Sequence, residues 1–265
     1  MSRRVIVVTG AARGIGYATA MRLAQDKDAL VLSGRDAATL EPVADEVRAF
    51  GAEAVVFAGD VREEAVVRGL METAISAFGR LDGLVNAAGI AKNVALLELD
   101  LATWNELFSL HATAAFLCSQ AAARVLVKQG EGGAIVNISS MAASMSMYTT
   151  GAYAAAKAAV SSLTRTLAVE LAEAHITVNA VAPGPVATEQ LRKVYGEAGY
   201  ADRSRSIPLN RLAEPAEVAG LIAFLLGPEA HYISGQVIGI DGGATAVGGY
   251  SFDTYRRHGS TAPRP

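Results

Sequence analysis

Short apolar runs alternate along the chain with longer segments in which apolar residues recur at helical spacing. Seven runs have the length and β-branched content of buried strands, and they lie within RVIVVTG, ALVLSGR, AEAVVFAGD, LDGLVNAAG, GGAIVNISS, HITVNAVAPG and GQVIGIDGG. The intervening periodicity predicts helices over residues 15–27, 36–50, 63–79, 103–129, 151–174 and 214–227. Strands that alternate with helices and are apolar throughout predict an α/β fold, a doubly wound, Rossmann-like sheet of seven parallel strands with helices on both faces.

The composition narrows the functional classes. The chain has 265 residues, of which 51% are hydrophobic, enough for one substantial core. A formal net charge of -3 and 18% charged residues argue against nucleic-acid binding and against a polybasic membrane binder. No apolar run approaches the roughly 20 residues that span a bilayer, and the first residues lack the core of a signal peptide. We therefore expect a soluble, cytoplasmic domain of the size of an enzyme.

Cysteine and histidine give no sign of a metal site. Cys118 is the single cysteine and lies within AAFLCSQAAA, so we expect it to be a small core residue. The four histidines are scattered without ligand spacing, at His111, His175, His231 and His258.

The first predicted strand runs into a glycine-rich turn, TGAARGIG, that precedes a helix. Glycines there allow a phosphate to approach backbone N–H groups at a helix N-terminus. We therefore expect Gly10, Gly14, Ile15 and Gly16 to bind a dinucleotide. The G-x-x-x-G-x-G spacing differs from the usual G-x-G-x-x-G fingerprint.

The end of the second predicted strand bears on the choice of cofactor. An acidic residue near this point binds the ribose hydroxyls of NAD, whereas an arginine binds the 2′-phosphate of NADP. Gly34 stands where such an acid would be, Arg35 follows, and Arg13 in the glycine-rich turn adds a second cation. The sequence favours NADP(H), with NAD(H) as the alternative.

Later strand ends continue the predicted nucleotide site. Asp60, followed by Val61, can accept a hydrogen bond from the adenine amino group, cap the next helix, or do both. The small residues Ala88 and Gly89 let a cofactor lie against the backbone, and Asn86 can tie neighbouring strands together.

The main catalytic pattern is Tyr153 followed four residues later by Lys157, in a segment rich in Ala and Leu. Side chains at i and i+4 share one helix face, and a cation beside a phenol favours the phenolate. Tyr153 is therefore suited to act as a general acid or base near neutral pH. Ser140 ends the fifth predicted strand at the same sheet edge, where it can hydrogen-bond a substrate oxygen.

Together these motifs resemble the short-chain dehydrogenase/reductase family, with a 3-oxoacyl-reductase-like pattern, over residues 3–243. The matching pieces are TGAARGIG, NAAG, the Ser140, Tyr153 and Lys157 trio, Pro183-Gly184 and the closing IDGG. The resemblance implies that Tyr153 is the catalytic acid/base, that Ser140 steadies the substrate oxygen, and that Lys157 binds the nicotinamide ribose while lowering the Tyr153 pKa. It also implies a homotetramer and a nicotinamide bordered by Pro183, Gly184, Val186 and Thr188.

On this basis we expect a single domain over residues 1–243, with a substrate lid at about 185–210. Residues 244–265 form a C-terminal extension past the resemblance. This extension is either a frayed terminus or a segment whose Tyr250, Phe252 and Tyr255 pack on a neighbouring subunit.

One position departs from the family pattern. Seven residues after Trp104 the family usually has an Asn that supports a water relay to the lysine, and here the residue is His111. Either the relay water bonds chiefly to the backbone carbonyl, which any residue supplies, or His111 itself passes protons, since its unperturbed pKa near 6.5 suits a shuttle.

The expected reaction is reversible hydride transfer between NADP(H) and a ketone or secondary alcohol. The methionine-rich stretch from Met141 to Met147 predicts an adaptable pocket beside Ser140, so we expect a small or medium, largely apolar substrate. The lid cations are either solvated or meet an anionic substrate such as an acyl-carrier thioester, and they are Arg192, Lys193, Arg203 and Arg205.

Three alternatives remain open. A 3-oxoacyl thioester reductase and an NAD-linked alcohol or sugar dehydrogenase use the same motifs. A non-catalytic nucleotide sensor is the competing class, and loss of Tyr153 or Lys157 would be its signature; both are present.

Overall fold

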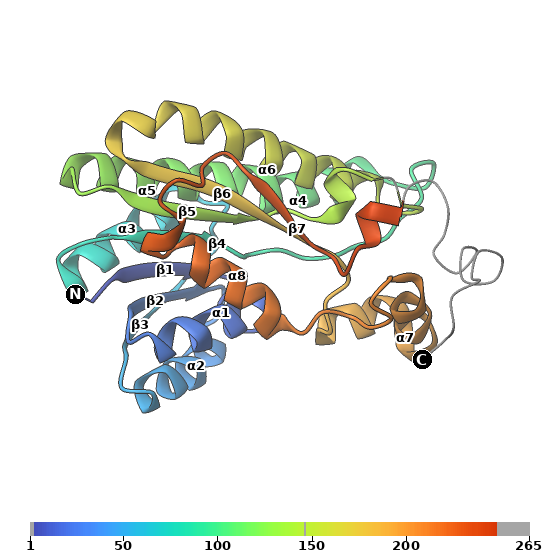
Figure 1. Cartoon of the computed structure of the whole chain (residues 1–265), viewed down its shortest axis with the longest axis horizontal. Coiled ribbons are helices and arrows are strands. Elements are labelled where there is room, and N and C mark those ends of the chain that lie inside the picture. The colour runs from blue at the N-terminus through green and yellow to red at the C-terminus, as the bar shows by residue number, and fades with distance from the viewer. Residues whose placement is uncertain (1–2, 146, 248–265) are drawn as a thin grey trace.

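The computed structural model describes residues 3–145 and 147–247 and is built on one seven-stranded sheet (Figure 1). All neighbouring strands run parallel, in the order β3-β2-β1-β4-β5-β6-β7. The predicted doubly wound, Rossmann-like α/β fold is confirmed. The strands are β1 Val5–Thr9, β2 Ala29–Gly34, β3 Glu53–Ala58, β4 Gly83–Asn86, β5 Gly133–Ile138, β6 Ile176–Pro183 and β7 Val237–Ile240.

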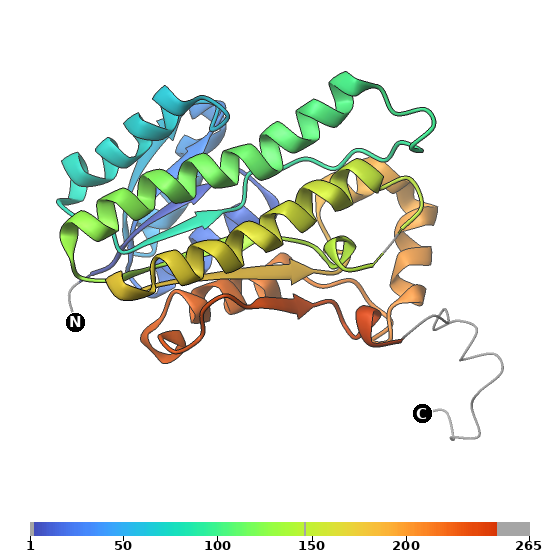
Figure 2. The same cartoon turned by 90° about the horizontal axis from the view of Figure 1, so that it is seen from above.

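Helices cover both faces of the sheet. One face carries α1 Gly14–Gln25, α2 Ala37–Ala49 and α8 Pro215–Leu225, and the other carries α3 Glu64–Phe78, α5 Ala114–Gln129 and α6 Gly151–Glu170 (Figure 2). Successive strand residues point to opposite faces, so Ile6 and Val8 pack in the first layer, and Val5 and Val7 pack in the second. Burial on both faces explains why these strands are apolar at every position.

The helix before α5 differs from its prediction. α4 Leu101–Phe108 begins two residues earlier than expected, because the Asp100 side chain accepts a hydrogen bond from the Thr103 backbone N–H at 2.6 Å. A turn of π-helix, Ser109–Thr113, then joins α4 to α5 and contains His111. Cys118 of α5 lies in the core as predicted, and burial raises the pKa of its thiol to about 12.

The stretch from Leu101 to Gln129 is long and apolar enough to cross a membrane by length and composition alone. Core helices of sheet proteins pass the same test, and 44% of its apolar window is buried inside this fold. The stretch therefore carries no argument for a membrane span.

The segment predicted as a lid contains a helix that the sequence pattern did not indicate. This helix, α7 Glu189–Ser206, lies beyond the carboxyl ends of the strands (Figure 1). Gly196 interrupts it with φ 65° and ψ 177°, so α7 consists of two helical pieces that meet at a kink. The predicted contacts of Tyr250, Phe252 and Tyr255 lie outside the described residues.

Candidate active site

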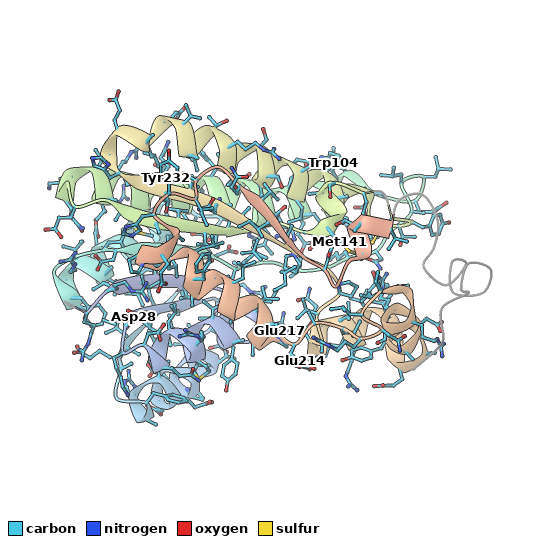
Figure 3. The ribbon with its side chains drawn as sticks, viewed as in Figure 1. Asp28, Trp104, Met141, Glu214, Glu217 and Tyr232 are labelled. Atoms are coloured by element: carbon cyan, nitrogen blue, oxygen red, sulfur yellow. The ribbon has the colours of Figure 1, made fainter. Side chains whose placement is uncertain are left out.

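The predicted catalytic residues meet at the carboxyl edge of the sheet. Ser140 follows β5, Tyr153 and Lys157 lie in the first two turns of α6, and His111 lies in the π-helical turn. Figure 3 shows Met141, the neighbour of Ser140, at the end of the molecule that carries α7. Residues far apart in sequence are thus gathered where a doubly wound fold has its ligand site.

Buried amide side chains fix this edge. Asn86 of β4 donates from Nδ2 to the Asn137 side-chain oxygen of β5 at 2.8 Å and to the Ser119 hydroxyl of α5 at 2.9 Å. Asn137 in turn donates to the Thr164 hydroxyl of α6 at 2.9 Å. Because unpaired polar groups are costly in a dry interior, this connected network ties two strands and two helices together. The strand-tying role predicted for Asn86 is confirmed.

Lys157 lies over the Tyr153 ring, but its hydrogen bond goes to the backbone of β5. Lys157 donates from Nζ to the Ile138 backbone carbonyl at 2.6 Å, and its Nζ lies 5.8 Å from the centroid of the Tyr153 ring. Burial lowers the pKa of Lys157 to about 7. Burial has the opposite effect on Tyr153 and raises its pKa. A side-chain hydrogen bond with Ser140 opposes this rise, and the phenol of Tyr195 in α7 adds to the rise.

The direction of the Tyr153 shift differs from the sequence-based expectation of a lowered pKa. Helix spacing correctly predicts that Lys157 shares a face with Tyr153, but the ammonium points to a carbonyl of β5. Desolvation then outweighs the opposing hydrogen bond with Ser140, so the pKa of Tyr153 lies above its ordinary value and the phenol is protonated at neutral pH.

His111 is 3% exposed and is held on one side only. Its Nε2 lies 2.8 Å from the Ile90 carbonyl, which can only accept, so this nitrogen carries the proton. The other nitrogen, Nδ1, is buried and has no hydrogen-bond partner among the residues that the structure describes. The ring meets Tyr153 edge-on with centroids 5.2 Å apart. Burial lowers the pKa of His111 to about 3, the charge of Lys157 adds to this shift, and the Ile90 bond opposes it. His111 is therefore neutral at physiological pH.

The glycine-rich turn presents free backbone donors. Arg13 precedes α1 without capping it, whereas α2, α4 and α7 each have a side-chain cap. A Cβ on Gly10 would lie 2.8 Å from Ala88 Cα, and one on Gly16 would lie 2.2 Å from the Gly10 carbonyl. Only glycine fits this close packing, and the first N–H groups of α1, which begins at Gly14, remain available to a phosphate.

The residues at the adenosine side of this turn carry charge. Within the described part of the chain, neither Arg13 nor Arg35 has a carboxylate within 4.0 Å, and both are exposed. Asp60 accepts hydrogen bonds from the Arg62 backbone and side chain, which lower its pKa, and the charge of Arg35 adds to this. Asp60 thus caps the turn before α3, which begins at Glu64.

The residues expected to border a nicotinamide lie between β6 and α7. Pro183 ends β6, and a Cβ on Gly184 would lie 2.8 Å from the Asp241 Cα. Val186 is buried, and Thr188 caps α7 by accepting from the Leu191 N–H. A separate cavity of about 10 Å³, with room for a single water molecule, is lined among others by Val61, Asn86, Ala88, His111 and Lys157.

Helix α7 is fastened over the site. The Tyr195 hydroxyl accepts a hydrogen bond from Asn93 Nδ2, in the loop between β4 and α4, at 2.5 Å. A Cβ on Gly14 would lie 3.5 Å from Thr188 Cγ2, so the start of α7 also lies beside the glycine-rich turn. This helix therefore contacts both the nucleotide side and the catalytic side of the site.

Comparison with known proteins decides the family. A family model described as enoyl-(acyl carrier protein) reductase matches residues 10–245. A 3-oxoacyl-[acyl-carrier-protein] reductase from Synechocystis sp. is 40% identical over 245 residues, which is 92% of this chain and 97% of that protein. The chain belongs to the short-chain dehydrogenase/reductase family.

Other members of the short-chain dehydrogenase/reductase family agree with this assignment. A cis-4-hydroxycyclohexanecarboxylate dehydrogenase from Sinomonas cyclohexanicum is 42% identical over 247 residues, covering 93% of this chain and 98% of that protein. The crystal structure of a short-chain type dehydrogenase/reductase from Mycobacterium marinum has a TM-score of 0.89 at 34% identity and covers 92% of this chain and 96% of that one. The protein is therefore an oxidoreductase of this family, with a nicotinamide cofactor.

Several site residues of this short-chain dehydrogenase/reductase were not found from sequence. Asn137 carried a signal, since it is the one amide in the apolar run AIVNISS, but its partners Ser119 and Thr164 lie in ordinary helix positions. Asn93 and Tyr195 are 102 residues apart, and no local pattern links them.

The kink in α7 of this short-chain dehydrogenase/reductase is expected to require glycine. At φ 65° and ψ 177° a residue with a Cβ is strained by about 1–3 kcal/mol, while the space around Gly196 is open, so Gly196→Ala strains only the backbone. We expect α7, which contributes no buried residue, to relieve this strain by changing its kink, so KM for the carbonyl substrate should rise about tenfold while the melting temperature stays nearly unchanged.

Gly220→Ala in α8 is the matched control. This glycine also has open space for a Cβ but lies inside a helix, so alanine is expected to raise the melting temperature slightly and leave KM unchanged. Equal KM values for Gly196→Ala and the parent protein would show that the kink does not govern substrate binding.

Proposed function

We propose that the protein transfers a hydride reversibly between NADP(H) and a ketone or secondary alcohol. The proposal rests on the meeting of Ser140, Tyr153 and Lys157 beside an uncapped, glycine-rich helix N-terminus. The bound nicotinamide would supply or accept the hydride. By analogy with the family we also propose a cytoplasmic homotetramer.

Tyr153 would act as the acid in carbonyl reduction. Its raised pKa keeps the phenol protonated, and the protonated form is the one that can give a proton to the substrate oxygen. Ser140 would donate a second hydrogen bond to that oxygen. Its Oγ accepts from the Ala142 N–H at 3.1 Å, and its hydroxyl proton, which interacts with the Tyr153 oxygen, would turn to the substrate oxygen. Lys157, with a pKa of about 7, would hold the nicotinamide ribose and return a proton to Tyr153.

His111 would position the site and not carry protons. Its Nε2–H is engaged by the Ile90 carbonyl, and its pKa of about 3 leaves no imidazolium at neutral pH. These observations favour the relay in which a water bonds to the backbone carbonyl. The ring would hold the loop after β4 and support one edge of Tyr153.

The choice of NADP(H) is tested by Arg35→Ala. Arg35 is exposed and pairs with no carboxylate in the described ranges, so it is available for the 2′-phosphate. We therefore expect the variant to bind NADPH about 10- to 100-fold more weakly and to bind NADH with unchanged affinity. The measurement is nicotinamide fluorescence during titration of the purified protein. Arg68→Ala, which removes an exposed arginine from α3, should leave both affinities unchanged.

Two other substrates remain candidates within the same chemistry. The likeness to the Synechocystis 3-oxoacyl-[acyl-carrier-protein] reductase favours a 3-oxoacyl thioester, and tight NADH binding by the parent protein would favour an NAD-linked alcohol or sugar dehydrogenase. A panel of ketones, thioesters and sugars with the tighter cofactor separates these outcomes.

A further inference from the structure

The charges of α7 are almost completely paired within the helix. Among its four cations and three carboxylates, Lys193 pairs with Glu189 at 2.6 Å, and Arg192 pairs with Glu197 at 2.9 Å. Arg205 pairs with Asp202. The remaining cation, Arg203, has no carboxylate within 4.0 Å among residues 3–145 and 147–247.

Arg203 also differs from its neighbours in position. Its guanidinium carbon lies 3.6 Å from the centroid of the Tyr195 ring, and the side chain is half-buried, whereas the Arg205 side chain is 65% exposed. A second pair, Arg192 over Tyr200 at 4.6 Å, crosses the same kink. Each pair is eight residues apart, which a straight helix would separate by about 12 Å, so the kink is what brings the partners together.

The Tyr195 ring lies at the substrate end of the site. Its hydroxyl is held by Asn93, and its phenol contributes to the raised pKa of Tyr153, after burial as the main cause. Arg203 is therefore linked to the acid/base Tyr153 through a single side chain, that of Tyr195. Stacking uses the face of a guanidinium and leaves its N–H donors free in the plane, where a carboxylate can bind with two parallel hydrogen bonds.

We propose that Arg203 binds the carboxylate of the substrate, so that the enzyme acts on an oxo acid or hydroxy acid with an apolar body between the reacting carbon and the acid group. This inference rests on the proposed function and names its substrate class. The single cation of α7 left unpaired in the described part of the chain, Arg203, matches a substrate with one negative charge, and the buried Met141 beside Ser140 is an apolar side chain against which the body of the substrate can pack. The other three lid cations are neutralised by the lid itself and do not take part.

The test compares 4-oxopentanoate, 5-oxohexanoate and 6-oxoheptanoate with their methyl esters, at saturating cofactor. For the acid of best length we expect kcat/KM about 10- to 100-fold above that of its ester. Arg203→Gln should remove this preference by lowering the value for the acid alone, and Arg203→Lys should restore part of it. Arg205→Gln, two residues away and ion-paired, is the matched control and should change neither value.

Three results would overturn the inference. The first is an equal kcat/KM for acid and ester in the parent enzyme. The second is an equal loss of kcat/KM for acid and ester in Arg203→Gln, which would indicate that the stack on Tyr195 is purely structural. The third is turnover of neutral ketones without turnover of any oxo acid. Absence of turnover with every carbonyl compound would instead refute the proposed function, and the inference with it.

Discussion

Tyr153→Phe is expected to lower kcat by about 10²- to 10⁴-fold, the range for loss of a general acid. The ring would keep its edge-on contact with His111, so the fold and the site walls should be unchanged. Only the hydroxyl that interacts with Ser140 and would protonate the substrate oxygen is lost. The measurement is steady-state turnover of the best carbonyl substrate, together with the affinity for NADPH, which should stay the same.

Tyr148→Phe controls for this experiment. Tyr148 lies five residues earlier, is 88% exposed and should tolerate the same change without loss of kcat. If Tyr153→Phe kept turnover within about threefold of the parent enzyme, the assignment of Tyr153 as the acid would be wrong.

His111→Asn is expected to make the protein more resistant to acid. The pKa of His111 is about 3 in the folded protein and 6.5 by its ordinary value, so the unfolded chain binds a proton that the folded chain excludes between these limits. The contribution of neutral His111 to the free energy of unfolding is therefore fully present above about pH 6.5 and is lost as the pH falls toward about 3. Between about pH 6.5 and pH 4.5 the loss amounts to about 2 kcal/mol, and the Asn variant should not show it.

Urea unfolding at several pH values measures this difference. Lys157 does not interfere, because its pKa is lowered from 10.5 to about 7, so its contribution makes stability rise with pH only between those values. Replacing the exposed His231 with Asn should leave the fall of the unfolding free energy at low pH as it is in the parent protein. If the free energy of unfolding fell with pH in parallel for His111→Asn and the parent protein, a neutral, buried His111 would not be the cause of the stability lost in acid.

The sheet was predictable because the residues that form each strand lie within one short stretch of sequence and carry the apolar pattern that burial requires. Strands buried on both faces must be apolar at every position, and glycine-rich turns follow them where the backbone packs closely. The lid helix was not predictable, since residues 189–206 are largely polar, contain Gly196 and Gly199, and lack an apolar stripe. Its two pieces are held by Arg–Tyr stacks across the kink, which are tertiary contacts.

The site was predictable in composition but not in its electrostatics. Spacing identified Tyr153 and Lys157 as neighbours on α6, yet the direction of a pKa shift depends on which atom the lysine meets and how dry the site is. The Ile138 carbonyl fixes the position of the Lys157 ammonium, burial causes most of both pKa shifts, and the distant Tyr195 adds to that of Tyr153. None of them belongs to a motif that sequence alone reveals.

Helix α7 has a consequence for how this enzyme can diversify. It contributes no buried residue, and it joins the sheet through the cap at Thr188 and the buried Ile207. The proton-transfer residues, in contrast, belong to strands and helices that are locked by the Asn86 and Asn137 network. Substitutions in residues 189–206 can therefore change the substrate range with little cost to folding, while burial, the main cause of the Tyr153 pKa shift, is retained and only the smaller contribution of Tyr195 is altered.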